Sequence, residues 1–281
     1  MLAICGSLRG SQLPLRRYTT ADGLANNAVL SIASDSRGFL WFATAEGISR
    51  FDGFGFTNQT ESTGLPHSVV RQLLIGRHGN YWLATPEGLI RFRPDLPQSK
   101  PDRMVVIRPE GKPESASILA LLEDRGGKLW CGTQAGLYAI DDSASRTPRF
   151  AEVRIGLPGV SWGDSEVSGL AEDAEGGVWI GAADGTLYCR RPDRRVERYT
   201  STEAKPQAEI TRLLADRKGR IWVGRGNALY RSKLAVHPGG NGFERLSGQS
   251  ADRRKAVSST YSNRGTATCG WECIDVWHSF P

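Results

Sequence analysis

The stretch Asp35-Ser-Arg-Gly38-Phe-Leu-Trp41-Phe-Ala-Thr44 decides the fold of this chain, because the same phrase returns four more times along the sequence. Its tryptophan recurs at one fixed place in every copy, at Trp41, Trp82, Trp130, Trp179 and Trp222. Successive tryptophans are separated by 41, 48, 49 and 43 residues. Periods of about 40 to 50 residues, each with room for four short strands, are typical of β-propeller blades rather than of solenoids. The sequence therefore predicts an all-β propeller of four-stranded blades, five of which are clear.

Each part of the phrase has a mechanical role in the predicted blade. An Asp side chain accepts hydrogen bonds from nearby backbone N–H groups, and a Gly three residues later takes the left-handed conformation that closes a hairpin. We expect this turn to join the inner strand of a blade to a second strand, which is apolar on both faces because each blade lies between two neighbours. The expected inner strands are residues 29–34, 69–75, 118–123, 167–172 and 210–215.

A very small residue stands two positions after each tryptophan. These residues are Ala43, Ala84, Gly132, Gly181 and Gly224. The pattern predicts the point where adjacent sheets approach most closely, with room only for the tryptophan of the next blade. Because the tryptophan occupies one fixed point in every repeat, core packing is favoured over a platform for stacking carbohydrate.

A third and a fourth strand are expected to complete each blade. A second turn, such as Glu46-Gly47, leads into a third strand, for example residues 48–51 and 89–92. The weaker fourth strands are expected at residues 55–58, 104–108, 149–154 and 196–200. The segment from Leu15 to Thr19 matches an outer strand but precedes the first repeat. It could therefore complete the last blade and latch the ring.

The repeat pattern fades near the C-terminal end of the sequence. Gly265 lies 46 residues after Gly219, and residues 257–261 could form an inner strand, but Thr268 replaces the tryptophan. We expect a stump over residues 1–14, five blades over residues 15–235, and a degenerate sixth blade or disordered tail over residues 236–281. A divergent blade and a truncated or frame-shifted end both fit this last part.

The composition of the 281 residues is that of a folded protein, with 39% hydrophobic and 23% charged residues. The longest wholly apolar run, Ile118 to Leu122, is far shorter than the roughly 20 residues of a membrane helix. The net charge of +6 includes one dense cluster, made of Arg190, Arg191, Arg194, Arg195 and Arg198. A solvated outer hairpin is favoured there over a patch for an acidic ligand, and no nucleic-acid partner is expected.

Cysteine and histidine predict neither a disulfide framework nor a metal site. The five cysteines are Cys5, Cys131, Cys189, Cys269 and Cys273, an odd number without zinc-ribbon pairing. Cys269, Cys273 and His278 lack a standard metal-ligand spacing, so we expect no metal and no cofactor. The residues from Met1 to Ser7 have no basic n-region, and no signal peptide is recognisable.

The five phrases resemble the two-component regulator propeller repeat, whose members repeat Asp-x-x-Gly-x-Leu-Trp-x-Gly-Thr. The opening from Thr20 to Val29 is similar to the family's entry into its first blade, and the match covers residues 15–232. The resemblance implies a periplasmic or extracellular sensor propeller, generally of seven blades, placed ahead of a membrane helix and a histidine kinase, a diguanylate cyclase or a DNA-binding output. It also implies small-molecule or oligosaccharide ligands. Five or six blades would then be an incomplete seven-blade ring.

The function predicted from this resemblance is sensing or ligand binding, without an output domain in this chain. No kinase-like motif is present, so an output partner such as a membrane-anchored kinase would lie elsewhere, and no enzyme activity is expected. One alternative is a protein–protein interaction scaffold. A second is a streptogramin lyase-like enzyme, which would need a histidine and acidic groups at one rim. Of the four histidines, only His67 lies on a candidate rim, whereas His78, His237 and His278 do not.

Candidate ligand-binding residues follow from the topology of a four-stranded meander. The turn between the second and third strands and the connection to the next blade lie at the same end of a blade, and ligands favour loops on a rigid scaffold. Trp162 stands out because it lies outside the repeat phrase, so packing does not require it. The candidates are Asn26, Asn27, Glu46, His67, Glu87, Gln134, Trp162 and Asp184.

Overall fold

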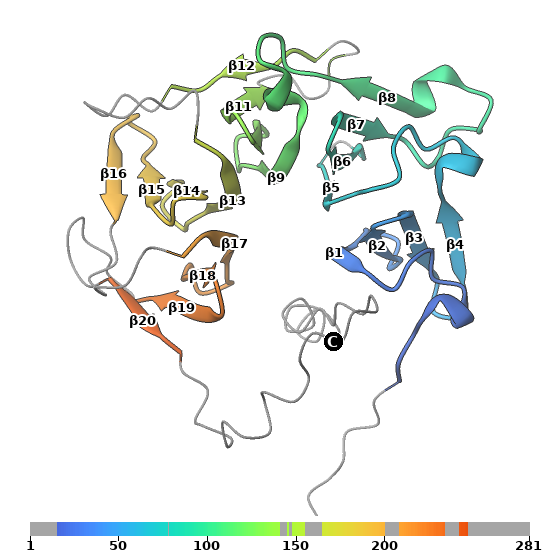
Figure 1. Cartoon of the computed structure of the whole chain (residues 1–281), viewed down its shortest axis with the longest axis horizontal. Helices are drawn as coiled ribbons and strands as arrows, with labels where there is room; N and C mark the ends of the chain where they lie inside the picture. Colours follow the sequence, from blue (N-terminus) through green and yellow to red (C-terminus); the bar gives the residue numbers. More distant parts are fainter. Residues whose placement is uncertain are drawn as a thin grey trace, which may run out of the picture.

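A computed structural model describes residues 16–77, 79–140, 145, 148–154, 165–199, 208–233 and 242–246 of the chain. Within these residues, twenty strands form five four-stranded sheets arranged around a common centre (Figure 1). Every sheet is an antiparallel meander whose strands follow sequence order from the centre outward. The predicted all-β propeller with five clear four-stranded blades is therefore confirmed.

The strands of each blade carry the labels of Figure 1. The first blade contains β1 (Val29–Ser34), β2 (Leu40–Thr44), β3 (Gly47–Phe51) and β4 (Phe56–Gln59). The second contains β5 (Gln72–Ile75), β6 (Tyr81–Thr85), β7 (Gly88–Phe92) and β8 (Met104–Ile107). The third contains β9 (Ile118–Glu123), β10 (Leu129–Thr133), β11 (Gly136–Ile140) and β12 (Ala151–Glu152). The fourth contains β13 (Val167–Glu172), β14 (Val178–Ala182), β15 (Leu187–Arg190) and β16 (Val196–Tyr199). The fifth contains β17 (Ile210–Ala215), β18 (Ile221–Arg225), β19 (Ala228–Ser232) and β20 (Phe243–Arg245).

Helical structure in the described residues is confined to four short 3-10 turns in the connections. They are η1 (Thr20–Asp22), η2 (Glu61–Thr63), η3 (Pro101–Arg103) and η4 (Pro113–Ala116). Across the described part of the chain, no helix has the length and apolar character that crossing a bilayer requires.

The turn between the first two strands of a blade forms as the repeat phrase predicts. In the first blade, Asp35 Oδ1 accepts hydrogen bonds from the backbone N–H groups of Arg37 and Phe39 at 2.9 and 3.0 Å. Gly38 has a φ of 84°, in the left-handed region that favours glycine. The second carboxylate oxygen of Asp35 accepts a bond from the Trp41 indole Nε1 at 3.0 Å, a link that the sequence analysis did not foresee.

In the third and fourth blades, the small residue after the tryptophan lies at a close approach between sheets. A Cβ atom on Gly132 would lie 2.5 Å from the Val167 carbonyl oxygen, and one on Gly181 would lie 2.6 Å from Ile210 Cγ2. Close approach is therefore confirmed, but the prediction that the next tryptophan fills this space is wrong. The neighbour is the first residue of the next blade's inner strand, because a bulge there turns that residue toward the preceding sheet.

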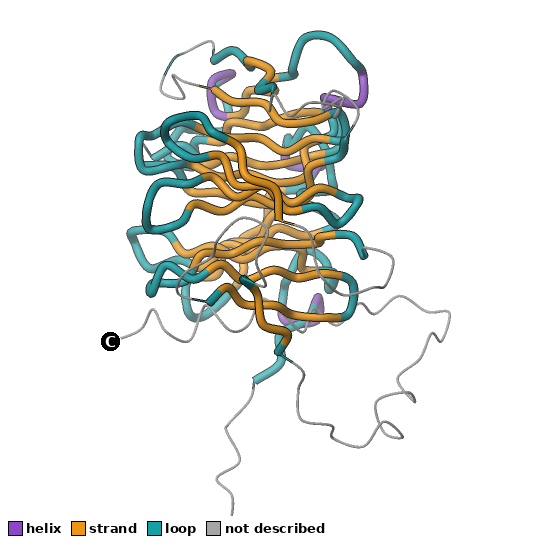
Figure 2. Tube along the Cα trace, turned by 90° about the vertical axis from the view of Figure 1, so that its left-hand side faces the viewer, coloured by secondary structure: helices purple, strands orange, loops and turns teal. Residues whose placement is uncertain are grey.

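The five inner strands pack side by side in the order β1, β5, β9, β13 and β17. In the side view of Figure 2, the strands run between two faces that carry the loops. The described blades leave the ring open between β17–β20 and β1–β4 (Figure 1). The predicted sixth blade lies outside the described residues, so a ring of more than five blades stays a prediction.

Two expectations at the ends of the propeller need correction. Residues 16–19 form no strand, and the Tyr18 ring packs on Phe51 and Phe56 of the first blade, with centroids 5.1 and 5.7 Å apart. The fourth strand of the fifth blade is β20, which pairs with β19. Residues 16–19 therefore do not supply that strand, and the fifth blade extends past residue 235 to Arg245.

Candidate functional site

One face of the propeller carries both the turns between second and third strands and the connections that enter the inner strands. A backbone hydrogen bond joins these two loops in four blades. The donor–acceptor pairs are Ala45 N to Ala28 O, Gln134 N to Ser117 O, Ala183 N to Glu166 O and Gly226 N to Glu209 O, at 3.0 to 3.2 Å. The topological argument that placed these loops at one end of each blade is therefore confirmed, and we call this end the connection face.

Four of the predicted ligand-binding residues lie on turns of the connection face and are exposed. Glu46, Glu87, Gln134 and Asp184 come from four successive blades. The Asp184 carboxylate accepts a bond from its neighbour Thr186 N at 2.7 Å, and Glu87 lies 3.9 Å from Arg108. Each of these side chains therefore belongs to a different blade.

Three other predicted residues organise their own loops. Asn26 Oδ1 accepts a hydrogen bond from Ala28 N at 2.7 Å, and Asn27 Oδ1 accepts one from Thr20 N at 2.9 Å. His67 Nδ1 accepts a bond from Val69 N at 3.0 Å, which fixes the ring in the loop before β5. Trp162, the eighth candidate, lies outside the described residues.

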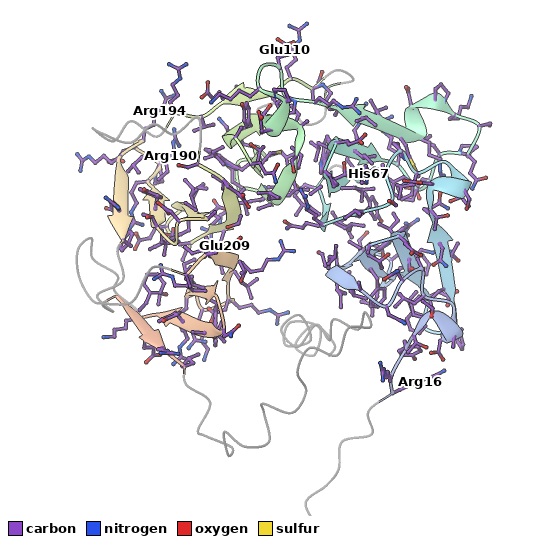
Figure 3. The ribbon with its side chains drawn as sticks, in the orientation of Figure 1. Arg16, His67, Glu110, Arg190, Arg194 and Glu209 are labelled. Carbon is purple, nitrogen blue, oxygen red and sulfur yellow. The ribbon has the colours of Figure 1, made fainter. Side chains whose placement is uncertain are left out.

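A second polar group on the connection face surrounds the entrance to the central channel. It consists of Arg71, Glu166, Glu209 and Arg212, which lie at the starts of β5, β13 and β17, and we call it the mouth cluster. Arg71 donates from Nη1 to Ser117 Oγ at 2.8 Å and to Ile118 O at 3.1 Å. Figure 3 shows Glu209 at the inner end of the fifth blade and His67 on the other side of the channel.

Arg212 connects blades that are distant in the sequence. Its Nη2 donates to the carbonyl oxygen of Leu30 in the first blade and to that of Arg71 at the start of the second, both at 3.2 Å. Because Arg212 itself belongs to β17 in the fifth blade, its side chain spans the channel entrance. The mouth cluster therefore draws on blades that are not neighbours in the described ring.

Burial and neighbouring charges shift the pKa values of two members of the mouth cluster, Glu166 and Arg71. Burial raises the pKa of Glu166, the negative charge of Glu209 raises it further, and the positive charge of Arg71 opposes both. Burial also lowers the pKa of Arg71, and Glu166 partly offsets this effect. Partly buried charges whose pKa values are shifted by desolvation and by specific neighbours are typical of functional sites.

The mouth cluster was not predicted, because its residues lie at or in the inner strands and not in the turns of the repeat phrase. The residue eleven positions before each tryptophan lies near the start of an inner strand, and its polarity differs strongly from repeat to repeat. These five residues are Leu30, Arg71, Leu119, Ser168 and Thr211. An alignment of the repeats at this position would have singled out Arg71, because none of the other four blades has an arginine there.

The arginine-rich hairpin of the fourth blade is largely engaged with its own surroundings. Arg191 forms ion pairs with Asp173 and Glu197 at 3.0 and 2.9 Å, and Arg190 lies over the Trp130 ring at 5.5 Å. Figure 3 places Arg190 and Arg194 on the outer part of this blade, away from the channel. Across the described part of the chain, no three His, Cys, Asp or Glu side chains form a group suited to a metal ion.

Several solved structures share this fold. One is the extracellular domain of a hybrid two-component system from B. thetaiotaomicron, with a TM-score of 0.64 and 24% identity over 80% of this chain but only 29% of that one. Virginiamycin B lyase from Staphylococcus aureus has a TM-score of 0.61 and 13% identity over 79% of this chain and 71% of the lyase. PorZ, a surface component of the type-IX secretion system of Porphyromonas gingivalis, has a TM-score of 0.59 and 18% identity over 77% of this chain and 34% of PorZ. At these identities the likeness concerns the fold.

Sequence comparison gives a narrower and more specific result. No curated protein sequence matches the chain. The family model of the two component regulator propeller matches residues 23–46, which contain the first two strands of the first blade and the repeat phrase. The resemblance noted from the five phrases is therefore confirmed, and the first blade carries a two-component regulator propeller repeat.

Proposed function

We propose that this chain is a sensory, ligand-binding propeller of a two-component-type signalling protein, and that the ligand contacts the mouth cluster on the connection face. The observation that carries the proposal is the convergence of Arg71, Glu166, Glu209 and Arg212 at the channel entrance. These charged groups stand on the ends of rigid inner strands, where ligand-binding groups are commonly found.

The ligand in this proposal is a small molecule or an oligosaccharide. Carboxylates such as Glu166 and Glu209 accept hydrogen bonds from sugar hydroxyls, and guanidinium groups donate to ring and hydroxyl oxygens. The likeness to an extracellular domain of a two-component system supports a periplasmic or extracellular location. An output partner, such as a membrane-anchored kinase, would then receive the signal.

Isothermal titration calorimetry with maltotriose, cellotriose and xylotriose tests this function. At least one of these oligosaccharides should bind, and Glu166→Gln and Glu209→Gln should each weaken its affinity by about tenfold, since a hydrogen bond to a charged group is lost. Glu110→Gln is the matched control, because Glu110 is exposed at the outer edge of the propeller, far from the channel (Figure 3). Equal affinity in all three variants would place the ligand elsewhere on the molecule.

A further inference from the structure

Two of the five arginines in the hairpin between β15 and β16 are paired with carboxylates. Arg191 forms ion pairs with Asp173 and Glu197, and Arg195 forms one with Asp193 at 3.2 Å. The other three have no acidic partner within the described part of the chain, and we call them the hairpin patch. They are Arg190, Arg194 and Arg198.

The charges of the hairpin patch lie close together. Arg198 lies opposite Tyr188 in the strand register, and Tyr188 stands two residues before Arg190, so all three project from one face of the hairpin. Burial lowers the pKa of Arg190, and the positive charge of the nearby Arg194 lowers it further. Figure 3 shows Arg190 and Arg194 together on the outer part of the fourth blade.

The third blade holds the Arg190 guanidinium in place. Its Cζ lies 5.5 Å from the centroid of the Trp130 ring, and that ring is buried between the blades. A guanidinium that stacks on an aromatic ring keeps the N–H donors in its own plane available for a carboxylate. Because the side chain is already ordered, less conformational entropy is lost when a partner binds to it.

Arg194 occupies a backbone position that favours glycine. Its φ is 70°, and among the described residues with a positive φ it is the only one that is not glycine. It follows Pro192 and Asp193, and glycine is the usual residue after Pro-Asp in such a turn. A side chain in this conformation costs free energy, and strained residues are concentrated at functional positions. The turn does not require an arginine here, so the strain indicates a role for the Arg194 side chain.

We infer that the hairpin patch is a docking surface for an acidic segment of a partner protein. The planar guanidinium group matches the two oxygens of an Asp or Glu carboxylate, and such charge-assisted hydrogen bonds are stronger than neutral ones. The patch lies away from the channel, so this inference goes beyond the proposed function and does not depend on it (Figure 3).

The exposure of the patch favours an acidic segment over other anions. Arg194 and Arg198 are exposed, and a single ion pair in contact with water contributes little, so a segment with several carboxylates fits better than a small molecule with one. A nucleic acid fits less well, because its phosphates follow a continuous basic stripe. The exposed carboxylate of Asp193 lies in the same turn and interrupts such a stripe.

Fluorescence anisotropy with a labelled octaglutamate peptide tests this inference on the full chain. Octaglutamate should bind, and an octaglutamine peptide should bind at least about tenfold more weakly, since it lacks the charges. Raising the salt concentration to about 0.5 M should weaken the binding of octaglutamate, because salt screens exposed charges.

The variant Arg194→Gly separates recognition from folding. It removes the guanidinium and also relieves the backbone, so the affinity for octaglutamate should fall at least about fivefold while the melting temperature rises by about 2 °C. Arg190→Met, which keeps an apolar side chain beside Trp130, should weaken binding by a similar factor. Arg217→Gln is the control, because it removes one positive charge from an exposed turn of the fifth blade and should leave the affinity unchanged.

Four results would overturn the inference. Equal affinity for octaglutamate and octaglutamine would show that carboxylates are not recognised. An equal loss in Arg217→Gln and Arg194→Gly would assign binding to net charge. A lower melting temperature of Arg194→Gly would make this arginine a structural part of the hairpin. Tighter binding of a single-stranded oligonucleotide or of phosphatidylglycerol vesicles than of octaglutamate would assign the patch to a nucleic acid or to a lipid surface.

Discussion

The interfaces between the described blades and the face of the fifth blade that no described blade covers contain the same residues of the repeat in different surroundings. Trp130 and Trp179 are each 2% exposed because the next blade covers them. Trp222 is only half-buried, and its cross-strand neighbour Leu214 is 43% exposed. All three indoles nevertheless donate to the Asp of their own turn, at 2.8 to 3.0 Å. The phrase alone therefore builds the turn, and the neighbouring sheet supplies the burial.

The largest expected difference between the two regions concerns the tryptophans. Trp130→Ala should destabilise the protein by about 3–5 kcal/mol, because it empties a fully buried interface between two blades. Trp222→Ala should cost only about 1–2 kcal/mol, since part of that ring already contacts solvent. Chemical denaturation measures both values, from midpoints and slopes fitted together.

The order of the two midpoints decides this prediction. Phe54→Ala is a useful control, because the Phe54 side chain is 96% exposed and should contribute nothing measurable. If Trp222→Ala costs as much as Trp130→Ala, the fifth blade is covered in solution by something beyond the described residues, and the comparison fails.

Glycine substitutions should give the next largest difference. Gly181→Ala should cost about 2 kcal/mol, because its Cβ would lie 2.6 Å from Ile210 Cγ2 in the next blade, where Ile210 is fully buried. At the equivalent Gly224, the atoms nearest to a Cβ all belong to the same blade, namely Thr211 Oγ1 at 3.0 Å and the backbone N and O of Arg212 at 3.7 Å. Gly224→Ala should therefore change stability by less than about 0.5 kcal/mol in thermal and chemical unfolding. Equal costs at the two positions would contradict the role of the neighbouring blade.

Much of the fold was predictable because each repeat contains the residues that form its own turn and strands. The inner strands β1, β9, β13 and β17 begin and end at the predicted residues. The edges were less predictable: β12 covers only Ala151–Glu152, although residues 149–154 were expected. An outer strand has one partner and one solvated side, so its sequence is weakly constrained and its ends are poorly marked.

The candidate site was less predictable than the fold, for a physical reason. The topology argument correctly placed Glu46 and Asp184 on one face, since it depends only on strand order. Arg212 lies in an inner strand and donates to the carbonyl oxygen of Leu30 across the channel. The two residues belong to different repeats, so the pattern within a repeat does not predict this contact. A long side chain in a strand can serve packing or recognition, and only the position of the opposite blades distinguishes these roles.

A pH experiment tests the turn of the fifth blade that contains Asp216. Burial raises the pKa of Asp216, but hydrogen bonds from the Trp222 indole, the Arg220 side chain and two backbone N–H groups outweigh it and lower the pKa from 3.8 to about 2. The folded state therefore favours the ionised carboxylate, which stabilises the protein above pH 3.8 and ceases to do so as the pH falls toward 2. Asp216→Asn should lower stability near neutral pH by about 1–2 kcal/mol.

Melting temperatures recorded over the acid range measure this effect. The difference between the wild type and Asp216→Asn should be constant above about pH 5 and shrink toward zero below about pH 3. A difference that does not depend on pH would assign the effect to lost packing rather than to the ionised carboxylate.

The smallest expected difference concerns the arginines at the other end of the blades. Arg125 donates from Nη1 to Ala174 O of the fourth blade at 2.7 Å, and its backbone N–H donates to Glu172 Oε2 at 2.9 Å. Arg217 stands at the same place in the fifth repeat, is exposed, and has no such contact within the described residues. Arg125→Ala should therefore cost about 0.5 kcal/mol, the net value of one solvated hydrogen bond, while Arg217→Ala should be neutral.

A double-mutant cycle of Arg125→Ala with Glu172→Gln should show coupling, because both side chains act at one interface. Equal losses from Arg125→Ala and Arg217→Ala would mean that these arginines act through overall charge, and the contact between blades would not be the cause.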